Sequence, residues 1–339
     1  MSRPCASQPT RRATIAGALA VVGARNALAQ APIWRAAQAL PLPIQEIYPT
    51  AHRGEIWVAG GFARPPGQDF LITDAVMRYA PQTDAWREGP ALPRPRHHVQ
   101  LVSAPNGLLA IGGYEPVGDP GLWVGQTGVW RLAPDAEAWT EVAPVPQPNG
   151  ETVAAVMASG VHVVGGRSPL GPANANWDDH GDVTNHWRYD PTANQWEAAA
   201  PALAPRNSAA GALINGAWHV VGGRTVAGGN IADHEVYDPK EDRWRAAAPM
   251  PLAQGGLAAA ALNGSLYAFG GEQFEPRKVF EETWIYDPTV DAWRSGPPMA
   301  TPRHGLGGVS LNGRIWAIGG ARQVGGLGTT PTLETLAPA

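Results

Sequence analysis

The chain has 339 residues, of which 44% are hydrophobic and 16% are charged, and its formal net charge is −4. A chain this apolar is not a disordered one, and without a basic excess it is not expected to bind nucleic acid. Its 41 glycines, 34 prolines and 14 tryptophans favour many short strands joined by tight turns, which is typical of an all-β protein.

The first 29 residues have the pattern of a cleaved export signal. Arg11 and Arg12 precede an apolar stretch at 15–24 that is too short to cross a bilayer, and small residues at 27–29 form a cleavage site. The paired arginines resemble a twin-arginine signal, so we expect a periplasmic or secreted bacterial protein. The alternative is an ordinary amphipathic helix. The one cysteine, Cys5, lies in this segment, so we expect a mature chain without cysteine and without a membrane span.

Residues 30–339 contain one unit that repeats at an interval of about 50 residues. In each unit a tryptophan comes 26 positions before the first residue of a Gly-Gly pair. The tryptophans are Trp34, Trp86, Trp139, Trp196, Trp244 and Trp293, and the first glycines are Gly60, Gly112, Gly165, Gly222, Gly270 and Gly319. The constant interval predicts six copies of one structural unit in a single domain.

Each unit contains the same elements in the same order. A proline-rich connection such as 87–93 leads to a run of small residues such as 208–213, which we expect to be a strand. An Asn-Gly turn such as 215–216 then leads into an apolar strand that ends at the glycine pair. A third strand carries Tyr-Asp-Pro, as at 189–191, and the next tryptophan follows it. The unit is therefore predicted to hold four antiparallel strands.

This pattern resembles the kelch repeat over residues 30–339. The resemblance implies a six-bladed β-propeller with four antiparallel strands per blade. Residues 332–338 align with a third strand that no tryptophan follows, whereas Trp34 has no third strand before it. We therefore expect the N- and C-terminal strands to complete the last blade together, which removes the open sheet edges. We also expect a monomer.

The variable part of each unit lies between the glycine pair and the next tryptophan. In a propeller it opens on the same face as the entry to the central channel, and binding residues concentrate on such loops. The triplets that begin the innermost strands, 16 to 14 positions before each first glycine, reach this mouth too. The ligand-binding candidates are Arg96, His97, Arg206, Gln254, Arg303 and His304 from the triplets, and Arg167, Arg224 and Glu272 from the loops.

Arginine is the commonest residue type among these candidates. Because a guanidinium group donates two parallel hydrogen bonds to a carboxylate, the arginines predict a small polar or anionic ligand, such as a sugar, a glycan or a peptide carboxylate. The alternative is that they bond the carbonyls of neighbouring blades. Glu46 and Glu151, also in the triplets, are the candidates for a catalytic acid and base if the protein is an enzyme.

The longest loop, in the third unit, contains a candidate metal site. Asp178, Asp182 and His186 are spaced four apart and resemble, loosely, the iron motif of plant kelch specifier proteins. Oxygen and imidazole ligands of this kind suit a divalent metal. The alternative is structural, because His186 has a counterpart in the next unit, His234. We expect no other cofactor.

Three functions remain open at this point. The first is a binding module for a small-molecule or glycan ligand. The second is an enzyme similar to the exported N-acetylneuraminate epimerases, which are six-bladed kelch propellers that interconvert sugar anomers with a Glu and an Arg. The third is a scaffold for a protein partner. The copper-radical chemistry of galactose oxidase is excluded, because the mature chain would lack the cysteine that it needs.

Overall fold

The computed structural model describes residues 1–2, 33–67, 69–118 and 123–337. The expected export signal therefore lies almost entirely outside the described residues. The elements of the described part are strands, apart from one 3-10 turn, η1 (Trp177–Asp179). The all-β architecture expected from the sequence is confirmed.

Among the described residues, six four-stranded antiparallel sheets form what we call blades 1 to 6. Blade 1 contains β3 (Thr50–His52), β4 (Glu55–Ala59), β7 (Val76–Ala80) and β8 (Ala85–Glu88). Blade 2 contains β9 (Gln100–Ala104), β10 (Gly107–Ile111), β13 (Val129–Leu132) and β14 (Thr140–Val142). Blade 3 contains β15 (Val153–Met157), β16 (Gly160–Val164), β19 (His186–Asp190) and β20 (Gln195–Ala198).

The second half of the chain repeats this arrangement. Blade 4 contains β21 (Ala210–Ile214), β22 (Ala217–Val221), β25 (His234–Asp238) and β26 (Arg243–Ala246). Blade 5 contains β27 (Ala258–Leu262), β28 (Ser265–Phe269), β31 (Thr283–Asp287) and β32 (Ala292–Ser295). Blade 6 contains β33 (Gly307–Leu311), β34 (Arg314–Ile318), β35 (Leu333–Leu336) and β1 (Trp34–Ala36).

The loops between the second and third strands carry smaller sheets of their own. In blade 1 these strands are β5 (Phe62–Ala63) and β6 (Leu71–Ile72), which pair with β2 (Ile44–Gln45). The others are β11 (Tyr114–Pro116) with β12 (Trp123–Gly125), β17 (Arg167–Pro169) with β18 (His180–Asp182), β23 (Arg224–Thr225) with β24 (Gly229–Asn230), and β29 (Glu272–Gln273) with β30 (Lys278–Val279). These hairpins hold the mouth loops in place.

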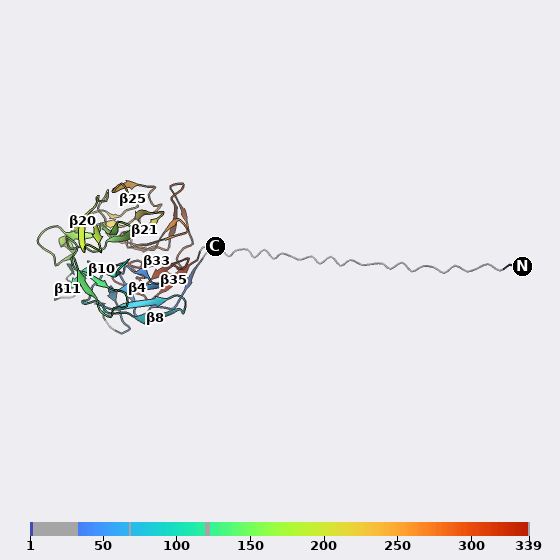
Figure 1. Cartoon of the computed structure of the whole chain (residues 1–339), viewed down its shortest axis with the longest axis horizontal. Coiled ribbons are helices and arrows are strands. Elements are labelled where there is room, and N and C mark those ends of the chain that lie inside the picture. Colours follow the sequence, from blue (N-terminus) through green and yellow to red (C-terminus); the bar gives the residue numbers. More distant parts are fainter. Residues whose placement is uncertain (3–32, 68, 119–122, 338–339) are drawn as a thin grey trace. The chain divides into compact units, whose positions relative to one another are not determined.

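Blade 6 is completed by both ends of the described body, as expected. Trp34 in β1 pairs with Leu336 in β35, and β35 pairs with β34. Figure 1 shows the early blue strand β4 close to the late red strands β33 and β35. The innermost strands β3, β9, β15, β21, β27 and β33 contact one another in a closed cycle. The chain therefore forms a closed ring of blades.

Local sequence explains the first hairpin of several blades. Asn215, Asn263 and Asn312 have φ of 51°, 51° and 53°, and the glycine after each also has a positive φ. Two successive residues with positive φ are what a type I′ turn requires, and Asn-Gly is the pair that adopts it most readily. The Asn-Gly dipeptides thus connect the first and second strands at these three positions.

Hydrophobic side chains fill the spaces between blades. The core consists of six clusters of buried residues, and each cluster draws on two adjacent blades. Between blades 1 and 2, for example, Trp57 packs with Leu108 and Trp130. Small residues allow the innermost strands to approach closely, since a Cβ added to Gly308 of blade 6 would lie 2.9 Å from the Ala258 Cβ of blade 5. The repeated small-residue strand is therefore a packing requirement.

A repeated hydrogen bond joins each blade to the next at the glycine pair. The Gly61 amide donates to the Arg96 carbonyl of blade 2 at 2.7 Å, and a Cβ on Gly60 would lie 2.3 Å from that oxygen. We call this contact between the glycine pair and the next blade a joint. The other five joints have the same hydrogen bond, with Gly113 donating to Asn149, Gly166 to Arg206, Gly223 to Gln254, Gly271 to Arg303 and Gly320 to Ile44. A side chain on the first glycine would block the joint, which explains the glycine pairs.

The side chain of the residue that supplies this carbonyl takes part in the same joint. In blades 2 to 6 it donates to the carbonyl of its own blade's first glycine, 16 positions later: Arg96 to Gly112, Asn149 to Gly165, Arg206 to Gly222, Gln254 to Gly270 and Arg303 to Gly319. The arginines are 0–3% exposed, and each also pairs with a buried glutamate. These candidates therefore lie inside the joints.

The tryptophans at the 26-residue interval make a second set of links. The indole N–H of each donates to the carbonyl four residues after the tryptophan of the preceding blade, over 2.8–3.2 Å. Trp34 follows the same rule and donates to Pro297 of blade 5 at 3.2 Å. The tryptophan and the glycine pair of each unit are thus both hydrogen-bonded to a neighbouring blade, which keeps the 26-residue interval between them constant.

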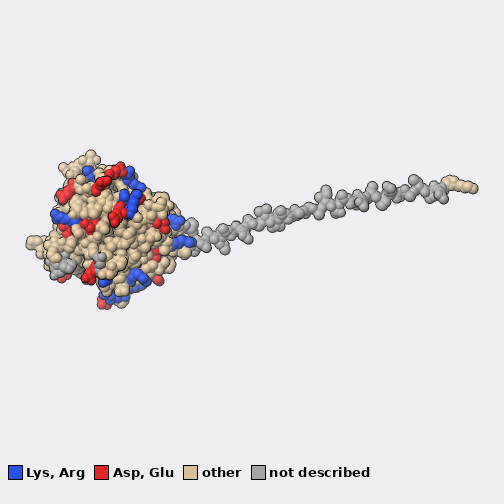
Figure 2. Space-filling view, turned by 90° about the horizontal axis from the view of Figure 1, so that it is seen from below, with Lys and Arg blue, Asp and Glu red and all other residues tan. Residues whose placement is uncertain are grey.

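Two surface features complete the description. On the face shown in Figure 2, Lys and Arg side chains lie among Asp and Glu side chains instead of gathering into a patch of one sign. Within the described part of the chain, no helix has the length and hydropathy needed to cross a membrane.

Two histidine pairs are buried between blades. His162 Nδ1 lies 2.8 Å from His186 Nε2, and His219 Nδ1 lies 2.9 Å from His234 Nε2. Burial lowers the pKa of His162 and His219 to about 3 and that of His186 and His234 to about 4. All four imidazoles are therefore neutral in the folded protein at neutral pH.

The histidine pairs predict that acid weakens the fold. In the unfolded chain these histidines bind protons below their ordinary pKa of 6.5, whereas the folded state keeps them neutral down to about pH 4. The free energy of unfolding should therefore fall by about 2 kcal/mol per histidine between pH 7 and pH 5. Denaturant unfolding at a series of pH values measures this slope. A flat profile over that interval would contradict the assignment.

The joints predict that Arg303 is structural. Arg303→Ala leaves the Glu334 carboxylate and the Gly319 carbonyl buried without their donor, so it should cost about 3–5 kcal/mol of unfolding free energy. Arg314→Ala removes an exposed arginine of the same blade and should change stability by less than about 0.5 kcal/mol. Equal melting temperatures for the two variants would show that the joint does not depend on the arginine.

Candidate functional site

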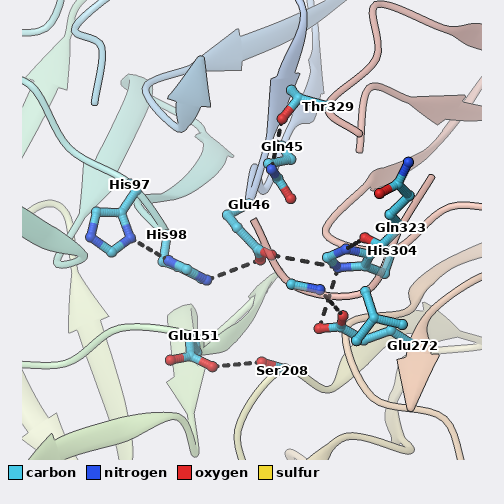
Figure 3. Close-up of polar contacts among 12 residues, drawn as sticks. Gln45, Glu46, His97, His98, Glu151, Ser208, Glu272, His304, Gln323 and Thr329 are labelled. Carbon is cyan, nitrogen blue, oxygen red and sulfur yellow. Dashed lines mark hydrogen bonds and ion pairs between the residues drawn. The ribbon is translucent and has the colours of Figure 1, made fainter. Parts of the chain in front are cut away.

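Six equivalent residues surround the channel at its mouth. They are the third members of the triplets, Glu46, His98, Glu151, Ser208, Gly256 and Gly305, and all have φ between 49° and 65°. Their amides bond from blade to blade: Glu46 donates to the Gly305 carbonyl, His98 to Glu46, Ser208 to Glu151, Gly256 to Ser208, and Gly305 to Gly256, over 2.7–3.3 Å. We call these six residues the mouth ring. Figure 3 shows the four side chains of this set, with Glu46 facing His98 and Glu151 facing Ser208.

The second member of each triplet pairs with the residue that follows the glycine pair. The backbone pairs are Gln45 with Phe62, His97 with Tyr114, Gly150 with Arg167, Asn207 with Arg224, Gly255 with Glu272, and His304 with Ala321. The two sets of positions that the sequence placed at the mouth are therefore direct neighbours in every blade.

Glu46 is the centre of a polar network at the mouth. Its Oε2 lies 3.0 Å from His98 Nε2 and its Oε1 lies 3.7 Å from His304 Nδ1. His304 Nδ1 also lies 3.3 Å from Glu272 Oε1. Figure 3 shows Glu46 between the two imidazoles, with Glu272 beyond His304. Blades 1, 2, 5 and 6 are linked in this way.

Arg224 continues the network through blades 3 and 4. Its Nη1 donates to Glu272 Oε1 at 2.8 Å, and its Nη2 donates to Ser208 Oγ at 3.2 Å. Ser208 Oγ in turn donates to Glu151 Oε2 at 2.5 Å. Every blade thus contributes at least one polar side chain to a single connected network.

The network fixes the charge of its members. Burial on its own would raise the pKa of the Glu46 carboxyl, but His98, His304 and Arg224 outweigh it and lower the pKa to about 2. Burial would lower the pKa of Arg224, yet Glu272, Glu151 and Glu46 raise it. Glu46 is therefore an ionised carboxylate and Arg224 a cation at neutral pH.

His97 and Tyr114 stand behind the network as an aromatic layer. The His97 ring stacks on Phe62 and Tyr114, with centroids 4.1 and 5.1 Å away, and its Nδ1 lies 2.5 Å from His98 Nδ1. Burial holds the pKa of His97 well below its usual range. His97 is thus neutral and fixes the ring orientation of His98.

A pocket of about 650 Å³ lies over the network. Its polar lining includes Gln45, Glu46, His98, Asn207, Arg224 and Glu272. Its aromatic lining consists of Phe62, Phe70, Trp123, Trp177 and Phe274, which come from blades 1, 2, 3 and 5. Phe62 and Trp123 have centroids 5.4 Å apart, and Trp123 meets Trp177 edge-on at 4.9 Å. The pocket thus combines polar acceptors with aromatic walls.

The mouth loops also carry most of the exposed apolar side chains. Of the eleven large hydrophobic residues that are exposed in the described part of the chain, seven lie on these loops. They are Phe70, Val117, Leu170, Trp177, Val226, Phe274 and Leu327, so that each blade contributes at least one. We call this set the apolar rim.

The structure brings together some of the candidates from the sequence and separates others. Glu46, Glu151, Arg224, Glu272 and His304 share the network, and His97 supports it. Arg96, Arg206, Gln254 and Arg303 bond glycine carbonyls in the blade joints instead.

Arg167 has a different position again. It donates to the Trp177 and His180 carbonyls, and its guanidinium group lies 3.3 Å from the Trp177 ring centroid. Arg167 therefore supports one aromatic wall of the pocket from behind.

The candidate metal ligands have separate partners. Asp182 accepts hydrogen bonds from the Asn207 side chain and the Val226 amide, and His186 bonds His162 and the Ala200 carbonyl. Asp178 lies in the short turn η1. Within residues 33–67, 69–118 and 123–337, no three His, Cys, Asp or Glu side chains are grouped so that they could hold a metal ion.

Sequence reasoning missed four aromatic residues of the pocket, Phe70, Trp123, Trp177 and Phe274. They lie in the variable loops, outside the repeating pattern, so the repeat gave no position for them. They could have been recognised by their chemistry, because large apolar side chains are unusual in surface loops, where polar residues are expected.

Comparisons with known proteins agree with this architecture. Residues 255–300 match the family model described as the Kelch motif. The chain is similar to Kelch-like protein terF of Aspergillus terreus, with 27% identity over 174 residues, or 50% of this chain and 37% of the relative. It is also similar to mouse Kelch-like protein 35, with 26% identity over 166 residues, or 49% of this chain and 25% of the relative. The matches thus cover well under half of these longer proteins.

A solved structure resembles nearly the whole chain. The match to the structure titled "Structure of YjhT" has a TM-score of 0.75 with 16% sequence identity, and it covers 89% of this chain and 97% of that chain. At this identity the likeness concerns the fold. Together with the glycine joints, the closed ring of blades and the Kelch motif match, it shows that the chain has the fold of a kelch-type β-propeller.

Proposed function

We propose that the protein binds a small hydroxyl-rich ligand, a sugar or the end of a glycan, in the mouth pocket. A kelch propeller is a scaffold for ligand binding or protein interaction, and the observation that favours a sugar is the lining of this pocket. Aromatic rings offer flat apolar surfaces for the C–H face of a sugar ring, while carboxylate and amide oxygens accept hydrogen bonds from hydroxyl groups. A volume of about 650 Å³ suits a ligand of this size.

The placement of the arginines bears on the charge of the ligand. Arg96, Arg206 and Arg303 are engaged in the blade joints, and Arg224 is the one arginine among the described residues that line the pocket. Arg224 is already paired with Glu272. We therefore favour a hydroxyl-rich ligand over the anionic one that the arginines had indicated.

A second candidate is a sugar isomerase, and the Glu46–His98 pair favours it. Ring opening and closure of a sugar need one group that accepts a proton and another that donates one. The ionised Glu46 carboxylate can accept a proton, and the His98 imidazole 3.0 Å away can donate one. Glu151, the other candidate, is bonded to Ser208 and is not among the residues that line the pocket.

A panel of monosaccharides and short oligosaccharides, titrated by calorimetry, tests the binding proposal. We expect at least one sugar to bind, and Trp123→Ala to weaken it about tenfold or more through loss of stacking, a change of about 1.4 kcal/mol. Val290→Ala, an exposed apolar residue outside the mouth loops, is the matched control and should bind normally. Binding that survives Trp123→Ala unchanged would place the ligand elsewhere.

Anomer-exchange NMR on the bound sugar separates a binding protein from an isomerase. Faster exchange that Glu46→Gln abolishes would support the enzyme. Binding without faster exchange would support the binding module. If no sugar binds, the apolar rim becomes the stronger feature, because seven exposed apolar side chains around one mouth suit a protein partner.

We also propose that the protein is exported by the twin-arginine route and acts in the periplasm or outside the cell. The proposal rests on the sequence of residues 1–29. Expression of the full chain in a bacterium should give a periplasmic product that begins near residue 30, and Arg11→Lys with Arg12→Lys should hold it in the cytoplasm. Export that is indifferent to this double substitution would contradict the proposal.

A further inference from the structure

The mouth pocket has an excess of hydrogen-bond acceptors. Three carboxylates, Glu46, Glu151 and Glu272, belong to its network, against one guanidinium group, that of Arg224, and two imidazoles, those of His98 and His304. That guanidinium group is occupied, because Nη1 bonds Glu272 and Nη2 bonds Ser208. The network therefore has little positive charge to offer a ligand.

Several acceptor atoms at the mouth lack a donor. Gln45 and Asn207 line the pocket, are 0% and 2% exposed, and have side-chain oxygens without a hydrogen-bond partner among the described residues. The hydrogen bonds of their NH2 groups fix the orientation of the two side-chain amides. Gln45 Nε2 donates to Thr329 Oγ1 at 2.7 Å, and Asn207 Nδ2 donates to Asp182 Oδ1 at 2.5 Å. Each amide thus holds a buried oxygen without a donor beside the pocket.

Glu46 supplies a charged acceptor beside them. Its Oε2 is paired with His98, whereas its Oε1 is 3.7 Å from His304 Nδ1, which is beyond hydrogen-bond distance. The side chain is 12% exposed and lines the pocket. The Oε1 oxygen of this ionised carboxylate thus has an ion-pair contact but no hydrogen bond, which leaves it able to accept one from a ligand.

A protonated amine matches this set of groups better than a hydroxyl does. An ammonium group has three donors and no acceptor, so each of its hydrogens can meet an acceptor, whereas a hydroxyl brings one donor and two lone pairs of its own. The aromatic walls add to this preference, because Trp and Phe rings attract cations at their faces. The acceptors and the aromatic rings therefore both favour a protonated amine.

We propose that the ligand of the mouth pocket is an amino sugar whose protonated amine is bound by the Glu46 carboxylate. The inference rests on the proposed sugar-binding function and specifies it. A sugar acid is disfavoured, because its carboxylate would lie beside Glu46 and Glu272, and the one guanidinium group in the described pocket lining, that of Arg224, is already paired.

Four probes that share one sugar ring test the inference: glucose, glucosamine, N-acetylglucosamine and glucuronic acid. They differ in a single substituent, and their β-1,4-linked dimers extend the comparison to a ligand that reaches the aromatic walls. Calorimetry near neutral pH should show glucosamine, or its dimer, binding at least tenfold more tightly than the neutral partners. Added salt should reduce this preference.

Two variants locate the effect. Glu46→Gln should remove the preference for the amine, so that the ratio of the glucosamine affinity to the glucose affinity falls to near one. Asp69→Asn removes an exposed carboxylate from a mouth loop outside the pocket lining and should keep the preference. The melting temperatures of both variants should match that of the unmodified protein, which checks that neither substitution disturbs the propeller.

The outcomes separate this inference from the function on which it rests. Equal binding of glucose and glucosamine, or tighter binding of glucuronic acid, would overturn the amine preference and leave sugar binding in place. A preference that survives Glu46→Gln would overturn the assigned position of the amine. If neither the four probes nor a wider sugar panel binds, the proposed function itself falls, and the inference falls with it.

Discussion

The structure depends on one hydrogen bond, from the second glycine of each Gly-Gly pair to a carbonyl of the next blade. A Cβ on the first glycine would lie between 2.3 and 3.1 Å from that carbonyl oxygen at each of the six joints, so only glycine admits it. The residue that gives the carbonyl also sends its side chain to the first glycine of its own blade, as Arg96 does to Gly112. Each joint therefore fixes the register of two blades at once, and six such joints close the ring.

The joints explain why the mouth can vary. Only the first residue of each triplet is committed to a joint, and the two residues that follow are carried to the mouth with their backbone already fixed. The third residue adopts the same left-handed conformation whether it is Glu46, His98, Ser208 or Gly305. The scaffold thus constrains the backbone of the mouth ring and leaves its side chains open to functional choice, which is the arrangement expected of a binding site on a rigid fold.

The contrast between constrained joints and variable mouth residues also explains what could be predicted from the sequence. The repeat and the completion of blade 6 by Trp34 could be predicted, because packing between blades imposes a constant spacing on the chain. The spacing locates a backbone position but not the direction of a long side chain, so Arg303 in a joint and Arg224 in the pocket could not be told apart. Trp123 and Trp177 lie in loops that no repeat constrains, and their approach depends on tertiary folding.

Charge pairing then singles out Glu46. The buried arginines of the joints each have a glutamate, as Arg303 has Glu334, and in the pocket Arg224 has Glu272. In each such pair the carboxylate is bonded directly to a guanidinium group. Glu46 is different, because its close partners are the imidazoles of His98 and His304, and its Oε1 makes no hydrogen bond to either. Of the two carboxylates in the described pocket lining, Glu46 is therefore the one without a bonded guanidinium group, and it belongs both to the mouth ring and to the pocket with the aromatic walls.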